Sequence, residues 1–252
     1  MTKTVLYQQD GHIARLTLNR PEKHNALGEV ELTLIQQYVS ITDENRDVRV
    51  LIVSGNGGST FCAGASLEQM NSGQISGDFF QQTTDMLRAS RVPTICAVNG
   101  NVFGGGVELA LSCDFRVGIE DTRMRVPAAA IGLCYPLQGI NRFVEKLGVN
   151  VAKRILIAAE ELSADDMLSV GFLDHLVMPA QLEQIVERLA GSIAGLAPMA
   201  VQSMKVILKQ VAAGNVDEKQ AQELAEGCRQ SDDLKEGYAA QREKRKPVFK
   251  GD

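Results

Sequence analysis

The sequence has few of the residues that mark disulfide-bonded or metal-binding proteins. Its five cysteines are odd in number, widely spaced and mostly inside apolar runs: Cys62, Cys96, Cys113, Cys134 and Cys228. Its three histidines lie far apart: His12, His24 and His175. This pattern is typical of reduced, buried thiols in the cytosol and contains no cysteine or histidine cluster suited to zinc. We therefore expect a cytoplasmic protein without a bound metal ion.

The sequence also lacks an excess of positive charge and any long apolar run. It has 26 Lys and Arg residues against 31 Asp and Glu residues, a net charge of −5. No overall basic field is therefore available to hold nucleic acid or an anionic membrane surface. No run of about 18 apolar residues is present to span a bilayer, and the alternating first segment has no signal-peptide core. We expect neither a nucleic-acid partner nor a membrane partner.

Short apolar runs alternate with helical patterns along most of the 252-residue chain. The first two runs, 5–9 and 13–18, flank Asp10-Gly11 and predict a β-hairpin. Further strands are expected at 48–54, 94–98, 115–119 and 172–178, and helices at 29–42, 151–159 and 164–170. Strands that alternate with helices through short links favour parallel pairing, so the sequence predicts an α/β fold.

From residue 180 onward the pattern is almost entirely helical. Helices are expected at 181–194, 199–212, 217–229 and 234–244. We therefore divide the chain into an α/β core, residues 1–195, and a C-terminal helical region, residues 196–252. The modest apolar stripes of these last helices indicate that they pack on the core or on another subunit.

Three stretches between the expected elements have no clear periodicity. Residues 55–66 form a glycine-rich loop after a strand, which is either a flexible connection or a place where a backbone N–H faces a ligand. Residues 67–87 are polar and mixed, and we expect this stretch to be the most mobile part of the chain. Residues 124–139 are irregular because Pro127 and Pro136 interrupt any helix. Such a loop among strands and helices is a candidate wall of a site.

The most informative stretch is Asn99–Leu111, NGNVFGGGVELAL. Three consecutive glycines after a buried strand allow a sharp turn and a close approach of a ligand to the backbone. A helix that begins there directs its free N–H groups out of the corner, where they can stabilise an oxyanion. Glu108 lies in the first helical turn between two apolar residues, which favours its neutral form and makes it a proton carrier. A phosphate-binding corner, or a tight turn with a Glu that complements the helix dipole, explains the same residues.

Several motifs in order along the chain resemble the crotonase superfamily, the enoyl-CoA hydratase and isomerase group. They are LNRPEKHNAL, FCAGASLEQM, VPTICAVNGNVFGGGVELALSCDFRV, VPAAAIGL, LSADDMLSVGFLDHLV and EGYAAQREKRKPVF. The resemblance covers essentially the whole chain. It implies a core of ββα repeats with a C-terminal helical region that mediates a homotrimer or a dimer of trimers. It also implies an acyl-CoA thioester as substrate, with coenzyme A as part of the substrate and no separate cofactor.

The resemblance further implies roles for individual residues. The N–H groups of Ala63 and Gly105 would form an oxyanion hole for the thioester carbonyl. Leu67 and Met70 would line the acyl pocket, and Ala63, Ala65, Leu67 and Gly105 would also be among the residues that bind the coenzyme A thioester. The coenzyme A end would meet Lys23 and the backbone of Ala26 and Leu27, and the tail residues Phe249 and Lys250 would contact the coenzyme A of a neighbouring subunit.

Two departures from the family pattern bear on the reaction. Hydratases of this group place a second glutamate after the proline of the later loop, where this chain has Ala128, so a two-carboxylate hydration mechanism is incomplete. Glu108 alone can still move a proton between two carbons, as a double-bond isomerase requires. Tyr135 resembles a tyrosine that lines the site of methylmalonyl-CoA decarboxylases, but those enzymes have histidine where this chain has Ala65. An isomerase-like enzyme, a decarboxylase of malonyl-type thioesters and a weakened acyl-CoA-binding member therefore stay open.

Overall fold

A six-stranded sheet forms the centre of the computed structural model, which describes residues 3–252. Its strands, in spatial order, are β1 (Val5–Asp10), β2 (Ile13–Leu18), β3 (Val50–Gly55), β5 (Thr94–Val98), β7 (Phe115–Ile119) and β10 (His175–Val177). β1 and β2 pair antiparallel, and the pairs from β2 to β10 are all parallel. The expected hairpin and parallel sheet are therefore confirmed.

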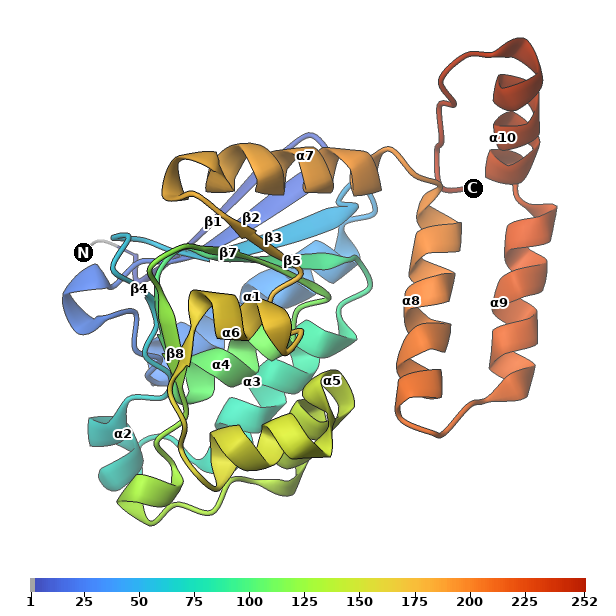
Figure 1. Cartoon of the computed structure of the whole chain (residues 1–252). Coiled ribbons are helices and arrows are strands. Elements are labelled where there is room, and N and C mark those ends of the chain that lie inside the picture. The colour runs from blue at the N-terminus through green and yellow to red at the C-terminus, as the bar shows by residue number, and fades with distance from the viewer. Residues whose placement is uncertain (1–2) are drawn as a thin grey trace.

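The inner strands are buried on both faces, which explains their continuous apolar sequence. Leu51 and Val53 of β3 belong to one hydrophobic cluster, and Val50 and Ile52 belong to another. The second cluster is completed by α7 (Leu182–Ala194), which contributes Val186 among others. Figure 1 shows α7 on one face of the sheet, with α1 (Glu29–Glu44), α3 (Gly77–Ala89) and α4 (Gly105–Leu111) on the other.

A second, four-stranded sheet of short strands lies at one end of the core. It contains β4 (Thr60–Cys62), β6 (Asn101–Phe103), β8 (Arg123–Arg125) and β9 (Leu162–Ser163). The sequence indicated loops at 55–66 and 124–139, but β4 lies inside the first stretch and β8 overlaps the start of the second. Strands of two or three residues are too short to show an alternating pattern, so the sequence could not reveal them.

The stretch 67–87 is more ordered than its mixed composition indicated. It contains α2 (Leu67–Asn71) and all but the last two residues of α3. The hydroxyls of Ser66 and Ser76 cap these two helices by accepting hydrogen bonds from the backbone N–H groups of Gln69 and Phe79. The buried face of α3 combines Phe80 and Leu87 with polar residues, which hid the helical period in the sequence.

The irregular loop after β8 is shorter than expected. A single 3₁₀ turn, η2 (Ala129–Ile131), is followed by α5 (Leu137–Leu156), which begins directly after Pro136. Gly148 has a φ of 77° and breaks the helical geometry inside α5. The helix expected at 151–159 is therefore only the last part of a longer element, and α6 (Ala164–Ser169) follows as predicted.

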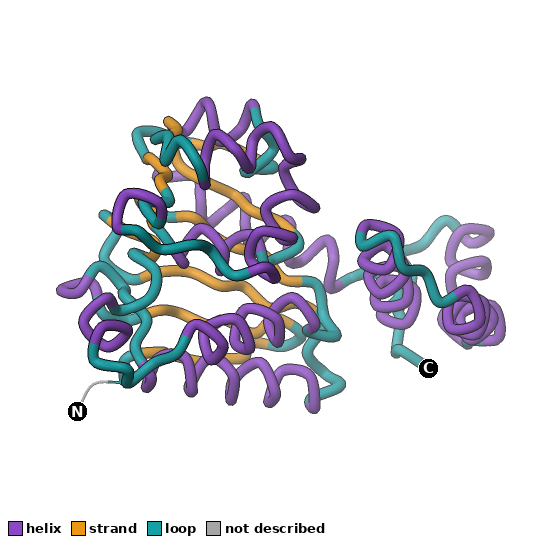
Figure 2. Tube along the Cα trace, turned by 90° about the horizontal axis from the view of Figure 1, so that it is seen from below, coloured by secondary structure: helices purple, strands orange, loops and turns teal. Residues whose placement is uncertain are grey.

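The remaining helices lie beside the core. α8 (Pro198–Ala212), α9 (Glu218–Gln230) and α10 (Asp232–Glu243) form a group that stands to one side of the sheet and its helices (Figures 1 and 2). The expected division after residue 195 falls in the link between α7 and α8. Two further 3₁₀ turns are present, η1 (Pro21–Lys23) and η3 (Pro179–Gln181).

Within residues 3–252, no single helix is both long and apolar enough to cross a membrane. Pro179–Ala194 and Pro198–Ala212 reach the length and composition only when taken together, and the two are bent by 104° from one another.

Candidate active site

The glycine corner predicted between β5 and α4 is present, and close packing explains why it must be glycine. Gly104 has a φ of 50° and caps the start of α4. A Cβ on Gly105 would lie 2.5 Å from the ring of Phe80, and a Cβ on Gly106 would collide with the carbonyl of Cys62. The backbone of this corner therefore reaches β4 and α3 without intervening side chains.

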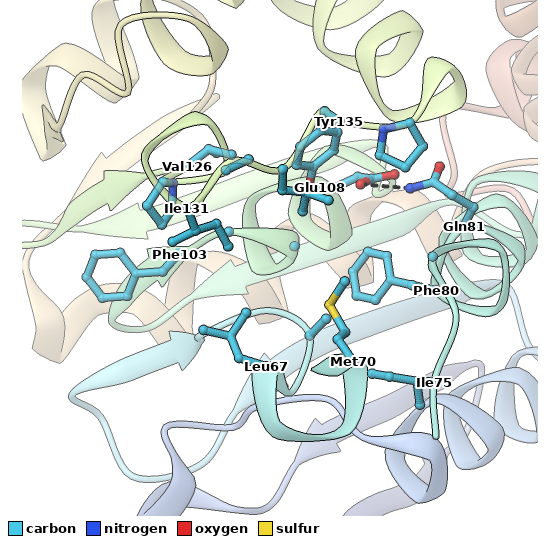
Figure 3. A pocket seen from close by; sticks show the side chains of 18 of the residues that line it. Leu67, Met70, Ile75, Phe80, Gln81, Phe103, Glu108, Val126, Ile131 and Tyr135 are labelled. Carbon is cyan, nitrogen blue, oxygen red and sulfur yellow. Dashed lines mark hydrogen bonds between the residues drawn. The ribbon is translucent and has the colours of Figure 1, made fainter. Parts of the chain in front are cut away.

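A cavity of about 180 Å³ opens beside this corner. Its wall is mostly apolar and comes from α2, α3, β6 and the loop after β8 (Figure 3). Its large apolar side chains are Leu67, Met70, Ile75, Phe80, Phe103, Val126, Ile131 and Leu133. Its few polar side chains include Gln81, Glu108 and Tyr135, which lie together at one end.

Glu108 is fully buried at that end and holds hydrogen bonds on both carboxylate oxygens. Oε1 accepts from Thr84 Oγ1 at 3.3 Å and is ion-paired with Arg142 Nη1, whereas Oε2 accepts from Gln81 Nε2 at 3.1 Å. Burial raises the pKa of Glu108, and the positive charge of Arg142 opposes part of that rise. Burial of this carboxylate and the direction of its pKa agree with the expectation from the sequence.

Tyr135 lines the same cavity and lies beside Glu108. Its ring packs edge-on against Phe143, with 5.6 Å between the ring centroids. Gly139 makes room for it, because a Cβ there would lie 2.6 Å from Cε1 of the tyrosine. Burial and the adjacent negative charge of Glu108 raise the pKa of Tyr135, so its phenol stays neutral and can donate a proton.

The backbone donor predicted at Ala63 is already used. Its N–H donates to the carbonyl oxygen of His24 at 3.0 Å, so it is not free for a thioester carbonyl. Ala65 offers a better donor, because it pairs with Leu27 in an isolated parallel bridge. In such a bridge the carbonyl of residue 64 and the N–H of residue 66 contact Leu27, and the N–H of Ala65 points away from it.

Ala65 and Gly105 lie on adjacent backbone segments at the cavity. Both residues line it, and a Cβ on Gly64 would lie 3.1 Å from Gly105 Cα. Among residues 3–252, no backbone carbonyl accepts a hydrogen bond from the N–H of Ala65. Gly105 is the first residue of α4, where N–H groups have no partner within the helix. Two backbone donors without a hydrogen-bond partner among the described residues therefore lie in the same part of the cavity wall.

The residues expected at the coenzyme A end lie outside the cavity wall. Lys23 ends η1, and its carbonyl accepts from the N–H of Ala26 at 3.0 Å. Leu27 is buried, and its N–H donates to Gly64. The structure therefore places these three residues on the segment next to residues 63–66, near the cavity but not in its wall.

Phe249 and Lys250 lie in the C-terminal region, beside α10 and away from the cavity. The Phe249 carbonyl accepts from Arg49 Nη2 at 2.8 Å, and the Lys250 N–H donates to Asp233 Oδ1 at 2.7 Å. These contacts fix the tail on its own chain, so the structure does not bring it to the cavity of the same chain. Contact with the coenzyme A of a neighbouring chain stays a prediction.

Sequence reasoning missed three residues that contact Glu108. Gln81 and Thr84 come from α3, inside the stretch that was expected to be mobile, and Arg142 comes from the part of α5 that was not predicted. The available signal was a polar pair at i and i+3 between Phe80 and Leu87, which places both on the buried face of a helix. Ala128, in contrast, lines the cavity as expected and offers no carboxylate.

Cysteines and metal ligands do not add to this site. Cys62, Cys96 and Cys113 are buried, Cys134 is exposed and Cys228 is intermediate, and all five are free thiols. Burial raises the pKa of Cys62 to about 12, so this thiol stays protonated and is not a nucleophile. In the described part of the chain, no three His, Cys, Asp or Glu residues are grouped to hold a metal ion.

Sequence comparisons identify similar proteins over the whole chain. A family model described as enoyl-CoA hydratase/isomerase matches residues 8–252. The mitochondrial enoyl-CoA hydratase domain-containing protein 2 of Homo sapiens is 35% identical over 259 residues, covering 96% of this chain and 87% of that protein. The crotonyl-CoA hydratase of Syntrophomonas wolfei is 30% identical over 254 residues, covering 98% of each.

Comparison of structures gives the same result. The crystal structure of an enoyl-CoA hydratase from Bacillus anthracis superposes with a TM-score of 0.93 at 27% identity. The superposition covers 99% of this chain and 100% of that one. The similarity therefore includes both the sheet core and the C-terminal helices.

Proposed function

Because this chain belongs to the enoyl-CoA hydratase/isomerase family, we propose that it shifts the double bond of an enoyl-CoA thioester, with Glu108 as the single acid–base group. One observation carries the proposal. Glu108 is the only acidic side chain in the described wall of the cavity, where it lies beside two unused backbone donors. A single carboxylate next to an oxyanion site is suited to moving one proton between two carbons.

The proposed reaction begins with the thioester carbonyl bound between the N–H groups of Ala65 and Gly105. Glu108 removes a proton from C2 of a 3-enoyl thioester, and the electrons of that bond form the enolate. Each backbone donor to the enolate oxygen is worth about 3 kcal/mol of transition-state stabilisation. Glu108 then returns the proton to C4, and the double bond forms between C2 and C3.

Hydration is disfavoured because it needs two proton-handling groups around a water molecule. Ala128 occupies the position where the second carboxylate of hydratases is expected, and it lines the cavity with a methyl group. Tyr135 contributes a phenol with a raised pKa, which can donate a proton but is a weak base at neutral pH. The named hydratases among the relatives therefore do not decide the reaction of this chain.

Decarboxylation of a malonyl-type thioester is the second candidate, and one observation favours it. The cavity is apolar, and Tyr135 stands at its polar end as a neutral proton donor. An apolar wall would desolvate the carboxylate of such a substrate and promote loss of carbon dioxide. The negative charge of Glu108 in the same cavity opposes this substrate by repulsion, so we place isomerisation first.

A product screen separates the candidates. The purified protein is incubated with a 3-enoyl-CoA, a 2-enoyl-CoA and a methylmalonyl-type CoA thioester. Products are separated by liquid chromatography and identified by mass, and the 2-enoyl isomer is distinguished from the 3-enoyl isomer by the ultraviolet absorbance of its conjugated thioester. The proposal predicts conversion of the 3-enoyl to the 2-enoyl isomer, abolished in Glu108→Ala. Formation of 3-hydroxyacyl-CoA or loss of carbon dioxide as the main reaction contradicts it. Binding of thioesters without turnover would instead indicate an acyl-CoA-binding protein.

The coenzyme A end of the substrate is proposed to lie along residues 23–27. Lys23 would pair with phosphate, and the backbone of Ala26 and Leu27 would contact the adenine. This segment supports the proposal because Leu27 pairs directly with Ala65 in a parallel bridge, so a ligand bound at Ala65 can extend along residues 23–27.

We also propose that the protein assembles as a homotrimer or a dimer of trimers. The support is the exposed apolar surface of α8, which includes Met204, Leu208 and Val211. In an assembly, Phe249 and Lys250 would approach the coenzyme A of a neighbouring subunit. Light scattering coupled to size-exclusion chromatography tests this, and a monomer would contradict it. A cytoplasmic location stays a prediction from the free cysteines.

A further inference from the structure

The guanidinium of Arg142 joins two carboxylates that lie on opposite sides of it. Nη1 pairs with Glu108 and donates to Thr84 Oγ1 at 3.1 Å, and Nη2 pairs with Asp85. The side chain of Arg142 is only 3% exposed, whereas that of Asp85 is 51% exposed. Arg142 is therefore a buried cation fixed between the acid of the cavity and an acid at the surface.

These contacts make the two oxygens of Glu108 different. Oε1 is occupied by Arg142 and Thr84, both outside the cavity wall. Oε2 accepts from Gln81, which lines the cavity. A Cβ on Gly139 would lie 3.2 Å from this oxygen and 2.6 Å from the Tyr135 ring, so Oε2 is the oxygen near the tyrosine (Figure 3). Only Oε2 is placed to exchange a proton with a substrate.

The positive charge of Arg142 also favours the ionised form of Glu108 before the reaction begins. Without it, a carboxylate that is fully buried beside a phenol would favour its neutral form. The groups that face Glu108 are Arg142 from α5, Gln81 and Thr84 from α3, and Tyr135 from the preceding loop. Arg142 is the only cation among them. Asp85 holds its far side, and the nearby Arg88 is paired with Glu145 at 2.5 Å.

We propose that Arg142 is a positioning residue that holds Glu108 ionised before each turnover and directs Oε2 into the cavity, so that Glu108 acts first as a base. This inference rests on the proposed function, because it assigns the first step of that reaction. It adds Arg142 from α5, with Asp85 from α3 as its second partner, to a site whose acid–base group, Glu108, lies on α4.

The test compares Arg142→Gln, which removes the charge, with Arg142→Lys, which keeps it. In the pH profile of kcat, activity falls on the acid side when Glu108 gains a proton. Loss of an opposite charge in contact shifts a carboxyl pKa by about 1–3 units, so this acid limb should move to higher pH by that amount in Arg142→Gln. Arg142→Lys should keep the limb in place but lose roughly tenfold or more in kcat, because its single ammonium cannot hold Glu108 and Asp85 together.

A purely structural role gives a different result. Such a role lowers kcat equally at all pH values, so an acid limb in Arg142→Gln at the wild-type pH would overturn the proposal. The proposal would also be overturned if Arg142→Lys had the kcat of the wild type and the acid limb of its pH profile at the wild-type pH. If Arg142→Gln does not fold, Arg142→Lys provides the test. Arg88→Gln, next to the network but outside it, is the matched control and should leave the limb unchanged.

A second readout separates this proposal from the proposed function. Infrared difference spectra, recorded against Glu108→Gln, follow the protonated carboxyl of Glu108 without any substrate. The signal should appear at higher pH in Arg142→Gln than in the wild type. If no CoA thioester is converted by the wild type, the proposed function fails, but this titration still decides whether Arg142 holds Glu108 ionised.

Discussion

The N–H of Ala63 donates to the carbonyl oxygen of His24 at 3.0 Å. Because this N–H is already used, the oxyanion donor expected at Ala63 is assigned to Ala65 instead. The intervening Gly64 has a φ of 88°, so the backbone is not a regular strand between the two alanines and their N–H groups have different partners. Ala63 thus has a structural role, because its N–H binds the segment that contains His24. Ala65 and Gly105 are the donors on which the proposed chemistry depends.

Replacement of Glu108 by Ala should remove most turnover while leaving coenzyme A binding nearly intact. General acid–base groups contribute roughly 10²–10⁴-fold to a rate, and no second carboxyl group lines the described cavity wall. Stopped-flow or product assays give kcat, and calorimetry gives the affinity for coenzyme A. Glu120→Ala at the surface is the control. An unchanged kcat in Glu108→Ala would refute the assignment.

Introducing a carboxylate at position 128 should create or raise hydration of crotonyl-CoA. Ala128 is 7% exposed and lines the same cavity as Glu108, so Ala128→Glu supplies the second group that water addition needs. The rate of 3-hydroxyacyl-CoA formation is the measurement. Ala129→Glu, at an exposed neighbour, should show no gain. If Ala128→Glu also shows none, the missing carboxylate is not the only obstacle.

A methyl group on Gly105 should disturb the oxyanion site. Its Cβ would lie 2.5 Å from Cζ of Phe80, so the backbone N–H must move away from the thioester carbonyl or the ring must shift. Loss of one oxyanion donor costs about 10²–10³-fold in kcat, which Gly105→Ala should approach. Gly191→Ala in α7, where a Cβ meets nothing within 4 Å, controls for the substitution itself. Equal activities of the two variants would speak against the role of Gly105.

Lys205 should hold the C-terminal helices to the core. Its Nζ contacts Asp114 Oδ2 and the Val92 carbonyl, each at 2.6 Å, and its side chain is only 8% exposed. Removing one partner of a buried ion pair costs about 3–5 kcal/mol, so Lys205→Met should approach the lower end, since Asp114 is partly exposed. Urea denaturation measures the loss. Lys219→Met, in an exposed pair, should change stability by less than about 1 kcal/mol.

Local sequence patterns account for the sheet and for the reacting corner. All residues of β5 and the apolar residues 50–53 of β3 are buried, and such apolar runs have few alternatives to a central strand. The three glycines and Glu108 lie within five consecutive residues, so their proximity did not depend on long-range contacts. The strands of the second sheet and α2 were missed because their residues form neither a longer apolar run nor a periodic pattern, whereas equally short strands of the main sheet lie in apolar runs.

The sequence by itself determined which residues carry the chemistry: a glycine corner, one acid in its first helical turn, and an alanine where a second acid would be. Only the tertiary structure decided their environment. The partners of Glu108 come from positions 81, 84 and 142, and the choice of Ala65 over Ala63 depends on a bond to His24. The physical reason is that a hydrogen bond or an ion pair depends on distance in space, and residues far apart in the chain become neighbours only when the helices pack on the sheet.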